Sequence, residues 1–235
     1  MDARNESVNG WIGIVYELPL SLDRPLPAPV TLRELLENSH DTGRSDSSHK
    51  KPLFMPSLGH RFRLAQKLSE FVLHIHSCGW LHKGLRSDNI IFFPALKISI
   101  EDPYIVGWEY SRKEGNVEQT ESMLSDNSEA KLYAHPDQLK GQPYCCRFDH
   151  YQLGCLLLEI GYWKSLPAIR ASSKLPQGSS SESWAAYLTK RGDQLVFFMG
   201  EIYHEVTKRL LDGLDSEWNA EFGPDVVWKL RRCNA

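Results

Sequence analysis

The sequence predicts a mainly helical α+β domain with a few short strands. Residues 61–77 place apolar side chains on one stripe at helical spacing, which indicates an amphipathic helix. Residues 150–163 are apolar around most of the helical circumference, as expected for a helix inside a core. The β-branched runs are too short and too few to build a sheet-based fold of their own.

The first two predicted elements are a strand and a short helix. Residues 11–17 form an apolar, β-branched run that predicts a buried strand. Residues 18–29 contain four prolines, which exclude a helix there. Thr31 followed by Glu34 three residues later matches a capping box, so we expect a short helix to start at this point. Residues 40–51 are polar and predict a surface loop.

Short strands are expected after the amphipathic helix. Residues 90–93 predict one strand, residues 96–100 its hairpin partner, and residues 104–106 a third apolar stretch. Residues 113–131 are acidic and polar, which predicts a loop.

Helices are expected to close the chain. Residues 166–183 are rich in Ser, Pro and Gly and predict a loop. Two or three helices should follow, at about 184–191, 201–211 and 224–231, the last with Pro224 at its first position.

Composition narrows the class of protein. The net charge of -3 gives no electrostatic reason to expect nucleic acid or an anionic membrane as partner. No apolar run reaches the roughly 20 residues of a membrane helix, and the N-terminus lacks the pattern of a signal peptide. The five cysteines, with Cys145 and Cys146 adjacent, suit neither a disulfide framework nor a zinc site. We therefore expect a cytoplasmic protein in which Cys78 and Cys155 are buried thiols.

Two motifs carry a resemblance to a known family. Residues 82–92 read H-K-G-L-R-S-D-N-I-I-F, in which His82, Leu85 and Asn89 match the protein-kinase catalytic loop H-R-D-L-x-x-x-N. Residues 148–154, F-D-H-Y-Q-L-G, resemble the D-x-Y-x-L-G start of the large central helix of the kinase C-terminal lobe. The order of helix, loop, hairpin and apolar helix is also similar to that lobe. The chain thus resembles a protein-kinase-like C-lobe.

The resemblance implies a domain organisation. It covers about residues 11–231, so we expect an N-terminal tail at 1–10 and a kinase-like domain at 11–235. Glu17 and Leu18 look like the hinge that contacts nucleotide in this family. A glycine-rich loop and its lysine do not occur before residue 11, so the N-lobe is largely absent from the sequence, and an upstream segment stays open.

A narrower resemblance lies in residues 79–84, G-W-L-H-K-G. This short sequence is similar to that of fungal kinase-like domains that are joined to HeLo-type, prion-inhibition or other cell-death modules. The resemblance implies a role in fungal signalling or cell-death control.

The catalytic positions of the family are altered. Gly84 stands where the resemblance places the catalytic Asp, and Gly107 where it places the Asp of the metal-binding D-F-G motif. Of the two magnesium ligands only Asn89 remains. His82, Gly84, Arg86 and Asn89 are thus equivalents of catalytic-loop positions without an intact catalytic set. Asn89 and Gly107 would line a weak nucleotide site, and we expect no metal site.

Three other positions have structural roles by resemblance. Asp149 is expected to accept backbone N–H groups of the catalytic loop, although a plain N-cap of the following helix is an alternative. His82 is expected to be a core histidine, and Trp108 to fill the slot of the D-F-G Phe.

These observations predict a pseudokinase, a regulatory or interaction module with a protein partner. We expect weak binding of ATP and magnesium or none. Two alternatives stay open: an active atypical protein kinase that uses Asp88 or Glu109 as its carboxylate, and a truncated gene fragment.

Overall fold

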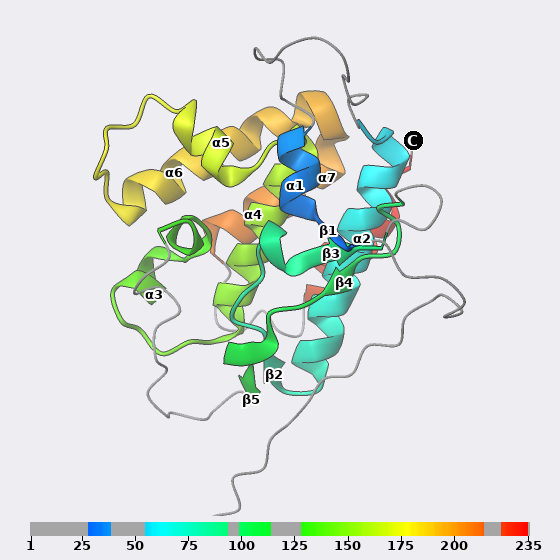
Figure 1. The fold of residues 1–235 in the computed structure, drawn as a ribbon, viewed down its shortest axis with the longest axis horizontal. Coiled ribbons are helices and arrows are strands. Elements are labelled where there is room, and N and C mark those ends of the chain that lie inside the picture. The colour runs from blue at the N-terminus through cyan, green and yellow to red at the C-terminus, as the bar shows by residue number, and fades with distance from the viewer. Residues whose placement is uncertain (1–27, 39–54, 94–98, 114–127, 214–221, 235) are drawn as a thin grey trace, which may run out of the picture.

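The fold is organised around one buried helix, α4 (Cys146–Tyr162), which runs through the centre of the molecule in Figure 1. The computed structural model describes residues 28–38, 55–93, 99–113, 128–213 and 222–234. Every residue of α4 from Phe148 to Gly161 is buried. The helix α2 (Leu58–Ser77) and the helix α7 (Val196–Asp212) both pack against α4. The predicted mainly helical fold with a few short strands is confirmed.

The short helix α1 (Leu32–Asn38) begins at the predicted capping box. The backbone N–H of Thr31 donates to the Glu34 carboxylate at 2.8 Å, and the N–H of Glu34 donates back to the Thr31 hydroxyl at 3.0 Å. These reciprocal bonds satisfy donors that a helix start leaves without partners. Leu32, Leu35 and Leu36 then face the core, which fixes α1 against the sheet.

A three-stranded antiparallel sheet lies beside α1 and α2. Its order is β1 (Val30–Thr31), β3 (Ile90–Phe92), β4 (Tyr104–Ile105), and Ile91 pairs with Thr31 on one side and with Tyr104 on the other. Both edges of β3 are therefore occupied. Of the hairpin partner predicted at residues 96–100, residues 96–98 lie outside the described residues, and residues 99–100 form no strand. The partner comes from the third apolar stretch instead.

A second small ladder closes the loop that carries the kinase-like motifs. β2 (Trp80–Leu81) pairs antiparallel with β5 (Arg112–Lys113). This pairing brings the residues just before His82 next to those just after Tyr110. The catalytic-loop equivalent and the D-F-G equivalent are thereby held at one end of the sheet.

The C-terminal part is helical, and one predicted loop is wrong. Residues 166–183 contain the helix α5 and the start of α6, because Ser165 caps α5 with its hydroxyl and a proline sits in the first turn. Within the described residues, 3₁₀ turns lie at Ser87–Asn89, Trp108–Tyr110, Ala130–Tyr133 and Asp193–Leu195. The remaining helical elements are α3 (Pro136–Leu139), α5 (Leu166–Ala171), α6 (Ser181–Gly192), a π-helical stretch (Gly223–Trp228) and α8 (Lys229–Arg231).

The core has two parts on opposite sides of α4. The larger part joins α1, α2, the sheet, α7 and the C-terminal helices, and the smaller part joins α5, α6 and the Ala130–Tyr133 turn. Cys155 lies in the smaller part, as expected. Cys78 is exposed, contrary to prediction, because α2 ends at Ser77 and Cys78 is its cap. The predicted strand at 11–17 lies outside the described residues.

Candidate functional site

Asp149, in the first turn of α4, is the centre of the site. Its fully buried carboxylate accepts the backbone N–H groups of His82 at 2.8 Å and Lys83 at 2.9 Å. The Tyr144 hydroxyl donates to it at 2.6 Å, and Nε2 of His76 lies 3.0 Å away. Burial alone would raise the pKa of this carboxyl, but the hydrogen bonds from His76 and Tyr144 hold the pKa below its usual value. The carboxylate thus ties α2, the loop and α4 together.

The backbone of Lys83 makes this arrangement geometrically feasible. Its φ of 69° lies in the left-handed region, which costs a non-glycine residue on the order of 1 kcal/mol. That turn lets two consecutive N–H groups point at one carboxylate. The Lys83 side chain is buried, and its ammonium lies 5.5 Å from the centroid of the Tyr144 ring. The attraction between a cation and an aromatic ring stabilises this position.

His82 is a neutral core histidine. Its Nδ1 accepts the N–H of Gly84 at 3.2 Å, and its ring lies 4.7 Å from the ring of Trp108 and 5.9 Å from that of Phe71. Burial lowers the pKa of His82 to about 4, against the attraction of the Asp149 carboxylate. The ring therefore carries no charge near pH 7, and its role in this environment is packing.

Trp108, which the resemblance places at the D-F-G Phe position, is partly buried. Its indole N–H donates to the carbonyl of Ile105 at 3.0 Å, and its ring meets Phe71 edge-on at 5.6 Å between centroids. An edge-to-face arrangement is favourable for aromatic rings. The indole thereby connects the D-F-G equivalent to α2.

Gly84 and Leu85 are held by backbone contacts. The N–H of Leu85 donates to the Gln152 amide oxygen at 2.9 Å, and the carbonyl of Gly84 accepts from the Asn89 amide nitrogen at 2.8 Å. Gly84 itself is buried and brings no functional side chain. A position that has to accept or orient a substrate proton needs a basic side chain, so Gly84 cannot perform that step.

The Asn89 side chain fills the space in front of Gly107. A β-carbon added to Gly107 would overlap the Asn89 amide, and Gly107 has a φ of 88° that only glycine adopts readily. The N–H of Val106 also donates to the Asn89 carbonyl at 2.9 Å. The amide nitrogen of Asn89 is therefore used in the hydrogen bond to Gly84, and the Asn89 side chain fills the space next to Gly107. A carboxylate at position 107 has no room while Asn89 keeps this position.

The two carboxylates of the active-kinase alternative lie at the periphery. Asp88 is 39% exposed, and its Oδ2 lies 3.8 Å from Nε of Arg86. Glu109 is exposed, although it lies near enough to favour the charged form of His82. Among the described residues no group of three or more His, Cys, Asp or Glu side chains has the arrangement of a metal site.

A second buried polar network adjoins the loop. Oε1 of Glu159 accepts the Tyr133 hydroxyl at 2.7 Å, the N–H of Leu166 at 2.6 Å and the Ser87 hydroxyl at 3.3 Å. The hydroxyls of Ser87 and Tyr133 are 2.8 Å apart. Burial raises the pKa of Glu159 to about 8, although the hydrogen bond from Tyr133 opposes the shift. The network links the catalytic-loop equivalent to α4 and α5.

The structure brings together most of the predicted site residues. His82, Gly84, Asn89, Gly107 and Asp149 lie in one connected set of contacts, whereas Glu17 and Leu18 lie outside the described residues. Three further residues, which were not predicted from the sequence, complete the set.

Those missed residues are His76, Tyr144 and Gln152. A signal existed for Gln152, because it follows Asp149 by three residues in an otherwise apolar helix and so shares its face. His76 and Tyr144 are distant in sequence, and only the fold places them at Asp149.

The chain is similar to protein kinases over part of its length. It is 30% identical over 105 residues to eukaryotic translation initiation factor 2-alpha kinase 1 of Mus musculus, a match that covers 42% of this chain and 16% of that protein. It is 26% identical over 129 residues to a probable inactive serine/threonine-protein kinase of Dictyostelium discoideum, with 55% of this chain and 10% of that protein covered. For GLH-binding kinase 1 of Caenorhabditis elegans the identity is 28% over 109 residues, and the coverage is 43% and 26%.

The chain therefore spans about a quarter or less of the length of these relatives. Together with the Asp149-centred loop, the matches support a protein-kinase-like domain. Within the part of the chain that the structure describes, no helix combines the length and the apolar character needed to cross a membrane.

A family model covers most of the chain. It matches residues 8–194, which include the kinase-like loop, the D-F-G equivalent and the whole of α4. The chain therefore belongs to the family described as a domain of unknown function, DUF7580.

Proposed function

We propose that this domain is a pseudokinase, a kinase-like scaffold that does not transfer phosphate and acts as a regulatory or interaction module. The observation that carries the proposal is the contact between Asn89 and Gly107, because it fills the position of a magnesium-binding carboxylate with an amide. The absence of a side chain at Gly84 supports it independently. The supporting scaffold around Asp149 is nevertheless fully assembled.

The chemistry of phosphoryl transfer explains why these two positions matter. The reaction depends on a carboxylate that orients the acceptor hydroxyl and on magnesium ions that neutralise the developing charge. Magnesium prefers charged oxygen ligands, so the Asn89 amide oxygen alone would bind it weakly. A fold that keeps its scaffold and lacks both carboxylates suits binding and regulation better than catalysis.

A phosphotransfer assay tests the proposal. The full chain, with ATP and magnesium and a general protein substrate, should show no transfer above that of a heat-denatured sample. The melting temperature should also stay within about a degree when ATP and magnesium are added, because weak ligands stabilise little. Metal-dependent transfer that disappears in Asp88→Asn or Glu109→Gln would overturn the proposal and favour an atypical kinase.

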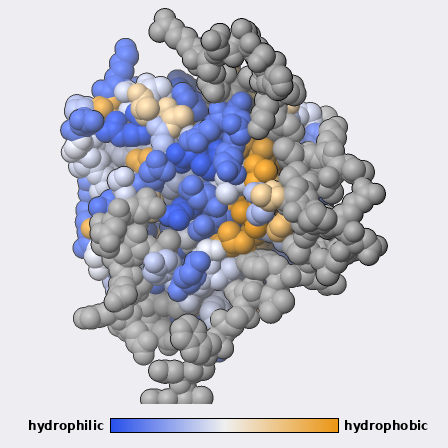
Figure 2. Space-filling view, viewed as in Figure 1, coloured by the Kyte–Doolittle hydropathy of each residue, from blue (hydrophilic) through white to orange (hydrophobic). Residues whose placement is uncertain are grey.

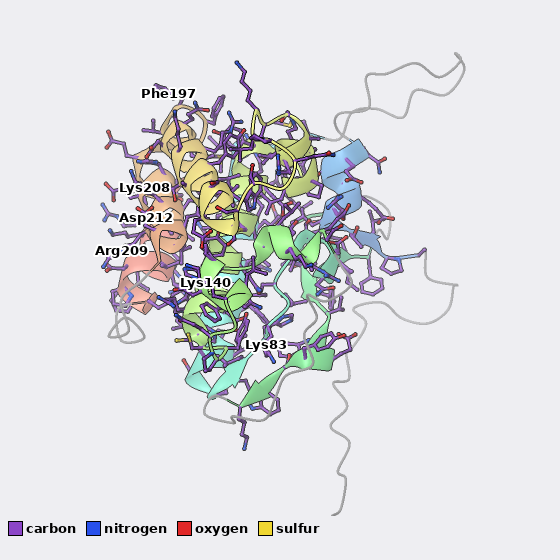
Figure 3. The ribbon with its side chains drawn as sticks, turned by 90° about the vertical axis from the view of Figure 1, so that its left-hand side faces the viewer. Lys83, Lys140, Phe197, Lys208, Arg209 and Asp212 are labelled. Atoms are coloured by element: carbon purple, nitrogen blue, oxygen red, sulfur yellow. The ribbon has the colours of Figure 1, made fainter. Side chains whose placement is uncertain are left out.

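Two exposed phenylalanines support the interaction part of the proposal. Phe197 is 83% exposed and Phe198 55% exposed at the start of α7, and Figure 3 shows Phe197 at the edge of the molecule. Adjacent exposed aromatic side chains favour a protein-binding surface. We expect proximity labelling in cells to recover a set of proteins with the wild-type chain that Phe197→Ser/Phe198→Ser no longer recovers. An identical set for both chains would contradict this location.

A role in fungal signalling or cell-death control is a narrower proposal. Its support is the string at residues 79–84, which resembles fungal kinase-like domains joined to cell-death modules. Expression of the chain in a fungal host should change viability after a cell-death stimulus. Equal viability with and without the chain would remove the support for this setting.

A further inference from the structure

The corner between α6 and α7 exposes two adjacent aromatic side chains. Leu195 and Met199 are buried and hold this corner to the core, whereas Phe197 and Phe198 face solvent. Because the two anchors already bury apolar area, packing does not require an aromatic residue at either exposed position. Figure 3 shows Phe197 on the side of the molecule away from α1, and the face that carries α1 is largely hydrophilic in Figure 2.

A break in α7 shapes this corner. Gly200 has a φ of 78° and a ψ of 170°, which are not helical angles, so the residues before it form a short turn of their own. This combination of angles is essentially restricted to glycine, and backbone outliers of this kind cluster at functional sites. Nothing lies within 4 Å of a β-carbon added to Gly200, so close packing does not explain the break. The break separates the exposed aromatic pair from the regular helix that follows.

Basic side chains lie beside the exposed pair. The ring of Phe198 lies 5.6 Å from the ring of Tyr162 at the end of α4, and the Arg191 guanidinium lies 4.3 Å from the centroid of the same Tyr162 ring. The Tyr162 hydroxyl also donates to the carbonyl of Arg191 at 2.8 Å, which ties α6 to α4. Lys164 follows Tyr162 two residues later. We name this surface the aromatic corner and define it by Tyr162, Lys164, Arg191, Phe197 and Phe198.

The two cations of the aromatic corner bond to neutral groups. The Arg191 guanidinium donates to the Gln194 amide oxygen at 2.8 Å, and the Lys164 ammonium donates to the Ser172 hydroxyl at 3.0 Å. Neither cation forms an ion pair with a carboxylate of the described residues. Arg231, by contrast, bonds a carboxylate at 2.8 Å, as other cations of the domain do. The aromatic corner therefore carries positive charge that no described acid neutralises directly.

The acids that are nearest in sequence do not change this result. Asp193 is already paired with Lys208 at 2.7 Å, and Glu201 is exposed beyond the break at Gly200. A guanidinium that is held over an aromatic ring can still bond a carboxylate through its N–H groups, and such charge-assisted hydrogen bonds are the strong ones. The chemistry that complements the aromatic corner is thus a carboxylate next to apolar area.

We propose that the aromatic corner binds an acidic and apolar segment of a partner protein, in which Asp or Glu stands beside a large apolar residue. Aromatic residues and arginine dominate the binding energy of protein interfaces, and charges of opposite sign select the partner. Aromatic and basic side chains together also suit single-stranded nucleic acid, but the net charge of -3 opposes that partner. The inference rests on the interaction part of the proposed function and adds the chemistry of the partner.

Selection of displayed random dodecapeptides against the full chain tests the inference. We expect the selected peptides to be enriched in Asp and Glu next to Leu, Ile, Phe or Trp. One selected peptide is then synthesised with its acids and with Asn and Gln in their place, and fluorescence polarisation gives both affinities. The amide form should bind about tenfold more weakly, because charge-assisted hydrogen bonds are lost. Selected peptides without acids, equal affinities of the two forms, or tighter binding of oligothymidylate would overturn the inference.

Variants of the chain place the binding at the aromatic corner. Arg191→Gln should weaken binding of the acidic form about tenfold and leave that of the amide form unchanged, whereas Phe197→Ser/Phe198→Ser should weaken both. Arg231→Gln removes the same charge from a cation that already has a carboxylate partner, and it should bind both forms as the wild type does. Lys164→Gln should give a smaller loss for the acidic form and serves as the test if Arg191→Gln does not fold.

The outcomes separate the partner's chemistry from the proposed interaction surface. Unchanged affinity for the acidic form in both Arg191→Gln and Lys164→Gln, or an equal loss in Arg231→Gln, would overturn the inference. Proximity labelling that depends on Phe197 and Phe198 but not on Arg191 would refute the acidic partner and leave the surface itself in place.

Discussion

The side-chain amide of Asn89 occupies the space in which a β-carbon at Gly107 would lie, so any larger residue at 107 would displace it. The amide is fixed from the other side by its 2.8 Å bond to the carbonyl of Gly84. The two glycines and the asparagine are therefore coupled. The carbonyl of Gly84 holds the Asn89 amide in place, and the missing side chain at Gly107 leaves room for it. Gly84, Asn89 and Gly107 thus form one continuous set of contacts.

Replacement of Gly107 by alanine should destabilise the domain in two separable ways. Its φ of 88° opposes any β-carbon, and that carbon would also displace Asn89. Gly141 is a matched control, because its φ is 85° and nothing lies within 4 Å of an added β-carbon. We expect Gly141→Ala to cost about 1 kcal/mol and Gly107→Ala about 1–3 kcal/mol more in urea unfolding. Equal losses would show that the Asn89 contact yields without cost.

Asp149 should be the most sensitive of the site residues. In Asp149→Ala the N–H groups of His82 and Lys83 and the Tyr144 hydroxyl lose a buried acceptor, so we expect a loss of at least about 3 kcal/mol. Amide hydrogen exchange at positions 82 and 83 should accelerate first. Asp102→Ala is the control, since its carboxylate is 73% exposed in an ion pair with Lys67 and should matter little. Similar losses in both variants would argue against a bracing role.

Long periodic helices were the predictable part of this fold. The amphipathic stripe of α2, the all-round apolar surface of α4 and the capping box of α1 each appear directly in the sequence, because each reflects contacts between residues three or four apart. Short elements lack such repetition. β1 has two residues and follows a proline, so its pairing with β3 depends on tertiary contacts that no local pattern encodes.

The connected part of the site was less predictable than its individual positions. The family motif located Asp149 and the loop, but His76 and Tyr144 reach the carboxylate only because α2 and the segment before α4 fold against it. The buried network at Glu159 could have been predicted from the sequence. A single acid within an apolar helix has to find buried hydrogen-bond partners or lose its charge. The loop prediction for residues 166–183 was wrong because it rested on the Ser, Pro and Gly content of the segment. The helix cap at Ser165 starts a helix there in spite of that composition.

Two buried histidines should make the domain sensitive to acid. Burial lowers the pKa of His82 to about 4 and that of His150 to about 3, from an ordinary value of 6.5. In this pH range the unfolded chain therefore binds protons that the folded chain does not bind. The free energy of unfolding consequently falls as the pH decreases from about 6.5 to about 4. Each histidine should contribute a few kcal/mol to this loss.

The variant His150→Phe tests this acid limb. It keeps a ring against Phe222, whose centroid lies 4.4 Å from that of His150, and removes one titrating group. The free energy of unfolding should change less between pH 6.5 and pH 4 than in the wild type. His74→Gln replaces an exposed histidine on α2 and should leave the slope unaltered. Parallel pH profiles for all three chains would contradict the prediction.

Glu159 should produce the opposite dependence at higher pH. Burial raises its pKa from 4.5 to about 8, so the folded chain keeps a proton that the unfolded chain releases above pH 4.5. The stability associated with this group is present below about pH 4.5 and is lost as the pH rises through about 8.

Glu159→Gln keeps an oxygen that can accept from Tyr133 and Leu166 and has no proton to release. The free energy of unfolding of this variant should depend less on pH between 5 and 8 than that of the wild type. The difference between the two free energies should grow by a few kcal/mol across that range. Glu201→Gln, at an exposed position of α7, is the control and should follow the wild type. A wild-type stability that rises between pH 5 and 8 in step with Glu159→Gln would mean that the carboxyl is ionised in the folded protein, and that the Ser87–Tyr133–Glu159 network holds a charge.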